Sequence, residues 1–126
     1  MINFNTNSAF NLKPISMQEM RQDVTRLMIN GEQPVMAFKT VRDQLIFTNK
    51  RIIAIDVQGL TGKRVSFSSM SYSKVQFFSI QTQGFMEMFP DSELSLSFTN
   101  GFTATFEFRG NVDIAAIGRM ISGFVL

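Results

Sequence analysis

Apolar and polar residues alternate along the middle of this chain, in short runs that turn residues separate. Runs of this length, rich in β-branched and aromatic residues, are typical of β-strands. We predict seven strands, at 35–41, 43–48, 51–57, 64–70, 75–83, 93–99 and 102–109. Several connections between them span only two or three residues, which forces antiparallel hairpins. The pattern therefore predicts a mainly β fold, a seven-stranded antiparallel sandwich or partly open barrel.

A helix is predicted on the N-terminal side of the strands, over 16–30. Ser16 and Glu19 have the spacing of a capping box, and the apolar residues that follow recur at helical spacing on one face. An Asn-Gly pair then supplies the stop. The preceding residues, 1–14, show no periodicity, and we expect a flexible N-terminal arm there. The predicted folded part is therefore one domain, 15–126.

A second helix is predicted after the strands, over 112–124. Asn111 is a favourable N-cap residue for it. One face of the helix is apolar and should point inward: Ile114, Ile117, Ile121 and either Phe124 or Val125. An amphipathic helix that follows a run of strands suits the role of a plug, and we expect it to cap one end of the sandwich.

The register of the last hairpin can be derived from the sequence. Leu96 and Phe98 on one strand, and Phe102 and Ala104 on the other, alternate with polar residues. A three-residue loop pairs Phe98 with Phe102 and brings both apolar sets to one face, whereas a two-residue turn sends them to opposite faces. We predict the longer loop, with Gly101 at the position that needs a left-handed residue.

The hairpin around residues 49–50 is apolar on both of its faces. A two-residue turn pairs Ile46 with Ile53, and the neighbouring pairs, which point to the other face, are apolar as well. One face belongs to the core. The other face must be covered either by the predicted helix or by a neighbouring subunit. The second alternative makes Ile46, Ile53 and Ile55 candidates for an oligomer interface.

Two absent residue types exclude several kinds of chemistry. The chain of 126 residues contains no Cys and no His. Disulfides, thiolate nucleophiles, Ser–His–Asp triads, and metal sites built on Cys or His therefore cannot form. The carboxylates are scattered over cap and turn positions, without the spacing of metal ligands. We predict a protein that is not an enzyme, with no catalytic residue, no metal ligand and no cofactor.

The charge balance argues against nucleic acid as a partner. Twelve basic and ten acidic side chains give a net charge of +2, so attraction to a distant polyanion is weak. Four basic residues nevertheless fall near turns at one end of the predicted sheet: Lys39, Arg42, Lys63 and Arg64. They are candidates for binding an anionic headgroup; the simpler interpretation is that they are solvated turn charges.

A short apolar run lies between the two groups of predicted strands. It contains Phe85, Met86, Met88 and Phe89 and ends at a Pro-Asp pair. One interpretation is an irregular edge strand folded onto the core. The other is an exposed patch that docks a protein or a membrane, because monomers rarely expose such clusters.

Three segments resemble a known family. Residues 42–53 (RDQLIFTNKRII), 56–63 (DVQGLTGK) and 71–75 (SYSKV) resemble the bacterial pleckstrin-homology-like proteins. Seven antiparallel strands followed by one helix is also the element order of the pleckstrin homology (PH) fold. The resemblance implies two near-orthogonal sheets closed at one end by the last helix, here with an extra N-terminal helix. It also implies a tendency toward ring-shaped homo-oligomers and a largely uncharacterised role.

The expected function is binding. The two-sided hairpin and the resemblance together predict a scaffolding module that self-associates and docks protein partners. The alternative is peripheral binding to anionic membranes through the basic turns. No run approaches the roughly 20 apolar residues that a membrane span needs, and the first residues lack a signal-peptide pattern. We therefore expect a cytoplasmic protein, with membrane association at its surface as the alternative.

Overall fold

The computed structural model describes residues 2–3, 8–82, 91–110 and 112–126. The strands are β1 (Ile2–Asn3), β2 (Ser8–Ile15), β3 (Pro34–Lys39), β4 (Gln44–Thr48), β5 (Arg51–Gln58), β6 (Arg64–Ser71), β7 (Val75–Thr82), β8 (Ser92–Phe98) and β9 (Thr103–Phe108). The helices are the 3-10 helices η1 (Gln22–Leu27) and η2 (Tyr72–Lys74) and the α-helix α1 (Ile114–Val125). All seven predicted strands are confirmed, with ends that differ by at most two residues.

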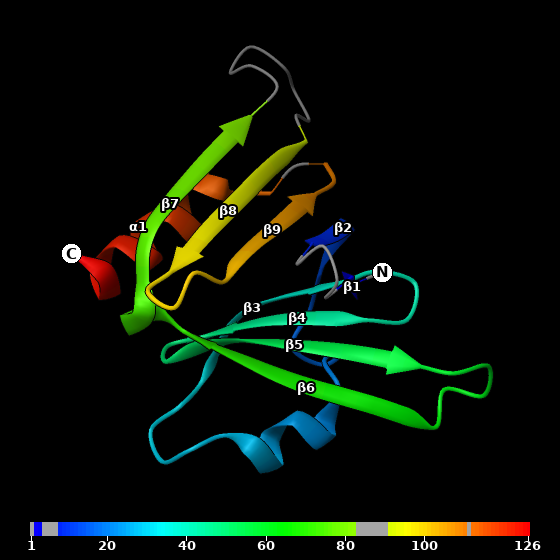
Figure 1. Ribbon diagram of the computed structural model, residues 1–126. Helices are drawn as coiled ribbons and strands as arrows, with labels where there is room; N and C mark the ends of the chain where they lie inside the picture. Colours follow the sequence, from blue (N-terminus) through cyan, green and yellow to red (C-terminus); the bar gives the residue numbers. More distant parts are fainter. Residues whose placement is uncertain (1, 4–7, 83–90, 111) are drawn as a thin grey trace.

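The strands follow one another in the order β6-β5-β4-β3-β2-β9-β8-β7, with β1 beside β2. They form two layers that run across each other, β3 to β6 in one and β7 to β9 in the other (Figure 1). β2 joins the layers, because it runs antiparallel to β3 and parallel to β9. Across the described part of the chain, β6 and β7 each pair with one neighbour only, so the sandwich is open between them.

The prediction of a flexible arm over 1–14 was wrong for residues 8–14. These residues belong to β2, which runs on past the expected domain boundary to Ile15. The pairing includes Pro14 with Phe38 on one side and Leu12 with Phe108 on the other. A strand paired on both sides is held by its partners, so it does not need the alternating pattern that would have revealed it.

Both predicted hairpin registers are confirmed. Leu96 pairs with Ala104, and the Phe98 amide donates to the Phe102 carbonyl at 2.8 Å, which closes the three-residue loop. Gly101 has a φ of +90°, in the left-handed region expected for it. In the other hairpin, Ile46 pairs with Ile53 across a two-residue turn. Local pairing therefore follows the sequence pattern closely.

The inner core fills the space between the two layers. The largest fully buried side chains in it come from both layers: Leu12, Leu45, Phe47, Ile52, Tyr72, Leu94, Leu96 and Phe108. α1 closes this core with Ile117 and Ile121, as predicted, and contacts β7 and η2. Asp113 caps the helix by accepting the Ala116 amide at 3.1 Å. Asn111, the predicted cap, lies outside the described residues.

A second, smaller cluster lies on the outer face of β4 and β5. Ile46, Ile53 and Ile55 are fully buried there, under Met20 and Val24 from the segment before β3. The first of the two predicted alternatives is thus the one that the structure adopts. The prediction of an oligomer interface at these three isoleucines was wrong, because their own chain already covers them.

The covering segment is not the predicted α-helix over 16–30. It consists of turns followed by the 3-10 helix η1. The Ser16–Glu19 contact of the expected capping box does form, with the amide 3.3 Å from Glu19 Oε1, but within a turn. Side chains of the sheet bind backbone groups that an α-helix would use itself: Gln44 Nε2 donates to the Glu19 carbonyl at 3.1 Å. The sheet therefore competes with helix formation.

An ion pair fastens the end of this segment to the sheet. Glu32 has a fully buried side chain and accepts from Arg51 Nε at 2.9 Å and from Thr48 Oγ1 at 2.6 Å. Arg51 also donates to the carbonyl of Leu27 at 2.5 Å. Burial raises the pKa of Glu32, but the hydrogen bonds from Arg51, Thr48 and the Ile29 amide outweigh it and bring the pKa below its ordinary value.

Candidate binding surfaces

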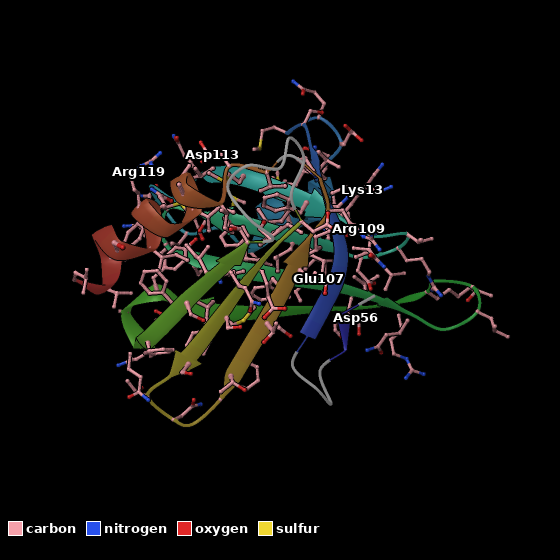
Figure 2. The ribbon with its side chains drawn as sticks, turned by 90° about the horizontal axis from the view of Figure 1, so that it is seen from above. Lys13, Asp56, Glu107, Arg109, Asp113 and Arg119 are labelled. Atoms are coloured by element: carbon pink, nitrogen blue, oxygen red, sulfur yellow. The ribbon has the colours of Figure 1, made fainter. Side chains whose placement is uncertain are left out.

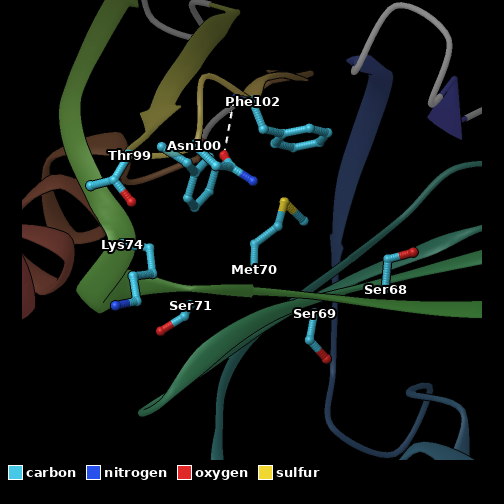
Figure 3. A pocket seen from close by; sticks show the side chains of 9 residues that line it. Ser68, Ser69, Met70, Ser71, Lys74, Thr99, Asn100 and Phe102 are labelled. Carbon is cyan, nitrogen blue, oxygen red and sulfur yellow. Dashed lines mark hydrogen bonds between the residues drawn. The ribbon is translucent and has the colours of Figure 1, made fainter.

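A groove lies between β6 and the hairpin of β8 and β9. It has a volume of about 590 Å³. Its floor is apolar, formed by Met70, Phe98 and Phe102, and its rim is polar, formed by serines of β6, Lys74, Thr99 and Asn100 (Figure 3). An apolar floor with a few polar groups around it is the usual make-up of a ligand site.

The groove follows from the position of β6 at the end of the sheet. Four consecutive residues, 68–71, line it, so the groove runs along the edge of the strand and not over one of its faces. Within the described residues this edge has no partner strand, and its backbone donors and acceptors are available to an added strand. The other wall is fixed, because the Thr99 amide donates to the Lys74 carbonyl at 2.8 Å.

The groove is poorly equipped for acid–base chemistry. Tyr72 lies in the core beside it, donates to the Thr48 carbonyl at 2.9 Å and stacks on Phe124. Burial, and secondarily the charge of Glu32, raise the pKa of the Tyr72 hydroxyl far above its usual range. Lys74 lines the groove, and none of the described residues that line it with Lys74 is a carboxylate.

A model of the bacterial PH domain matches residues 3–125 of this sequence. The chain belongs to the bacterial PH domain family. The uncharacterized protein YjqA of Bacillus subtilis (strain 168) is 37% identical over 86 residues, 68% of this chain and 67% of YjqA. The uncharacterized protein YozO of the same strain is 31% identical over 96 residues, 76% of this chain and 81% of YozO.

Solved structures of bacterial PH domains support the same fold. A DUF1696 family protein with a PH domain from Shewanella loihica PV-4 superposes with a TM-score of 0.76 at 34% identity, covering 94% of this chain and all of that one. A PH domain from Shewanella amazonensis SB2B gives a TM-score of 0.64 at 31% identity, covering 89% and 90%. The fold implied by the resemblance of residues 42–75 is therefore confirmed.

The predicted anion-binding residues of this bacterial PH domain fall into two places. Arg42 donates to the Gly59 carbonyl, 2.6 Å away, which ties the β3–β4 turn to the β5–β6 turn that leads to Lys63 and Arg64. Lys39 has a different contact, an ion pair with Glu19 at 3.4 Å. A single anion site built from all four residues stays a prediction.

Lys39 instead lines a basic cleft with two residues that the sequence analysis missed. Lys13 of β2 and Arg109, which follows β9, line the same cleft. The alternation that revealed the other strands is weak in β2, and a parallel pairing of β2 with β9 leaves no short-range pattern. The sequence therefore contained no signal that would have brought these three cations together.

Three predictions remain, on the apolar run, on metal ligands and on a membrane span. The apolar run of Phe85, Met86, Met88 and Phe89 lies outside the described residues. No group of carboxylates in the described ranges is arranged to hold a metal ion. Among the helices described, none has the length and apolar character that crossing a membrane requires.

Proposed function

We propose that this bacterial PH domain is a non-catalytic binding module that assembles with further copies of itself and presents the assembly to protein partners. The observation that supports this most is the pair of sheet edges, β6 and β7, that end the strand order without a second neighbour in the described residues. Unpaired edges bind other strands through main-chain hydrogen bonds.

The two edges have complementary surfaces. β7 carries Phe77, which is 62% exposed and stands on a face whose neighbours on β7 and β8, Ser79 and Ser97, are polar. The groove along β6 has the apolar floor that an aromatic ring can fill. We propose that β7 of one copy adds to β6 of the next, with Phe77 as the anchor in the groove.

Such a contact joins two different surfaces, so it is heterologous. A heterologous contact repeats from copy to copy until the rotation between copies closes a ring, or it continues as a filament. This agrees with the ring-shaped assemblies that the family resemblance implies. The assembly no longer depends on the outer face of β4 and β5, which the chain buries by itself.

The test is the molar mass in solution, measured by size-exclusion chromatography with light scattering. The wild-type chain should give a multiple of 14.3 kDa. Phe77→Ser, which removes the anchor, and Ser68→Lys, which places a charge in the groove without touching the Glu32–Arg51 ion pair, should each give monomers. The control is Leu60→Ser, an equally polar change at a fully exposed turn, which should leave the assembly intact. A wild-type monomer at micromolar concentration contradicts the proposal.

A second candidate function is peripheral binding to anionic membranes, favoured by two turns. Val41 and Leu60 are fully exposed at turns that the Arg42–Gly59 hydrogen bond holds together, beside Lys63. Apolar tips among basic residues suit an anionic bilayer surface. In vesicle co-sedimentation, Leu60→Ser should weaken binding to anionic vesicles, while Phe77→Ser should not. Binding that ignores lipid charge and salt contradicts this candidate.

A further inference from the structure

The basic cleft lies where β2, the end of β3 and the end of β9 meet. It has a volume of about 620 Å³ and is lined by Asn11, Lys13, Lys39, Thr40, Val41 and Arg109. Figure 2 shows Lys13 and Arg109 next to each other at this junction, away from the basic Arg119 on α1. Three separate parts of the chain thus supply one cation each to the same cleft.

Lys13 and Lys39 are directly opposite each other across the β2–β3 ladder. Both side chains are exposed and lie on the outer face, since the alternate residues Leu12 and Phe38 are buried. Directly opposed like charges destabilise a pair of strands. Among the described residues Lys13 has no ion-pair partner, so an anion placed between the two ammonium groups would relieve their repulsion.

Arg109 is held in place by an unusual residue of β2. Its Nε donates to Asn11 Oδ1 at 2.7 Å, and its own amide donates to the Leu12 carbonyl at 2.9 Å. Asn11 has a φ of +59° and lies where the β2–β9 register shifts, as in a β-bulge. Bulges commonly redirect a side chain beside a binding site. Here the bulge turns the Asn11 amide toward Arg109 and fixes the guanidinium at the cleft.

Two carboxylates approach these cations without closing the cleft. Glu19 is 3.4 Å from Lys39, with 49% of the Lys39 side chain and 52% of the Glu19 side chain exposed. Asp91 is 3.6 Å from Arg109, a long ion pair that is also open to water. Exposed pairs of this kind are weak because solvent screens them and holding them costs side-chain entropy. An incoming dianion can therefore compete for both cations.

We propose that this cleft is a binding site for a phosphate monoester dianion. A planar guanidinium held at one side can bind two phosphate oxygens, and the two opposed ammonium groups match the remaining charge. Thr40 adds a hydroxyl at the rim. The site shares no residue with the groove along β6, so it stands independently of the self-association proposed above.

The experiment is a titration with inorganic phosphate, followed by amide chemical shifts in the full chain at low ionic strength. Amides of residues 11–13, 39–41 and 109 should shift together. Lys13→Gln should weaken the affinity about tenfold, the usual effect of losing one charge-assisted hydrogen bond. Arg119→Gln, which removes the same charge from the exposed face of α1, is the matched control and should leave the affinity unchanged.

A second variant tests the role of the bulge without disturbing it. Glycine adopts the φ of Asn11 freely, so Asn11→Gly should keep the unfolding midpoint while it releases Arg109 and weakens phosphate binding. An unchanged affinity would show that Asn11 does not position Arg109. Equal losses in Lys13→Gln and Arg119→Gln would show only a response to net charge and would overturn the site.

The source of the phosphate is tested with vesicles. Phosphatidylcholine vesicles with and without phosphatidic acid present the same monoester on a lipid. Binding to phosphatidic acid but not to free phosphate, lost in Lys13→Gln, identifies a lipid headgroup as the ligand. Binding to free phosphate with no preference for these vesicles identifies a small soluble ligand. If neither probe binds, the proposal is wrong.

Discussion

The two faces of the β4–β5 hairpin are equally apolar but are covered in different ways. Ile52 faces inward, where the second layer and α1 close over it. Ile53 is the next residue and faces outward, where only a thin segment of turns and the 3-10 helix η1 lies over it. Both side chains are fully buried. The two side chains are therefore equally buried but not equally well supported. A sheet covers Ile52, whereas a short irregular segment covers Ile53.

The two covers are also held in place by different interactions. α1 packs so tightly that a Cβ on Gly118 would lie 2.6 Å from the end of the Ile80 side chain. The outer segment depends on polar contacts instead, above all the Glu32–Arg51 ion pair at 2.9 Å. Packing contacts respond to changes of volume, whereas the ion pair responds to pH. The two covers should therefore fail under different conditions.

The largest expected effect comes from the matched truncations Ile52→Ala and Ile53→Ala. Both leave a cavity, and Ile→Ala in a core costs about 2–5 kcal/mol, depending on how far the surroundings can settle. Ile52→Ala should fall near the upper end because its surroundings are rigid, and Ile53→Ala near the lower end because the segment can move inward. Urea unfolding measures both free energies. Equal losses would contradict the idea that the outer cover is the softer one.

An intermediate effect is expected from Glu32→Gln. The change removes the charge that pairs with Arg51, whose side chain is only 21% exposed, and should cost about 2 kcal/mol at neutral pH. Hydrogen exchange should increase in residues 16–31 and not in the inner core. Protection lost evenly over the whole chain would mean that the ion pair supports the entire fold.

The same variant reveals a pH dependence. The pKa of Glu32 in the folded chain lies below its ordinary value of 4.5. The ion pair therefore contributes its full stability above that value and loses it as the pH falls below 4.5, through the folded pKa. The difference in free energy of unfolding between wild type and Glu32→Gln should shrink over this acid range. A constant difference from neutral to acid pH would contradict the assignment.

The smallest effect is expected at two glycines of α1. Gly123 has open space around it, so Gly123→Ala should stabilise the helix by up to about 1 kcal/mol. Gly118→Ala gains the same helix propensity but must push aside the Ile80 side chain, so it should be neutral or destabilising. Thermal unfolding of the two variants compares them directly. If both stabilise equally, the seal between α1 and β7 is looser than its geometry indicates.

The elements predicted from sequence are those whose partners are close in the chain. The registers at Ile46–Ile53 and Leu96–Ala104 follow from alternation and loop length, because a one-residue slip would turn apolar residues outward. The outer cover was harder to predict. The pattern shows that Ile53 must be covered. The hydrophobic effect is not directional, however, so the pattern does not tell whether the same chain or a second copy covers this residue.

The features that escaped prediction depend on contacts distant in sequence. Sheet side chains such as Gln44 bind backbone groups of the 16–30 segment, which removes the advantage of an α-helix there. The basic cleft depends on β2 reaching Arg109, a contact that no local spacing encodes. Of the four predicted basic residues, only Lys39 belongs to it, and its two cationic partners become visible only in the fold.

The placement of β2 has a consequence for the way this protein is made. β2 leaves the ribosome well before its partner β9, because Leu12 pairs with Phe108 and the strands β3 to β8 lie between them in the chain. Loop closure over such a separation is slow. Until β9 has been made, the apolar faces of the hairpins in between therefore stay exposed, and transiently exposed apolar surface of this kind is prone to aggregate.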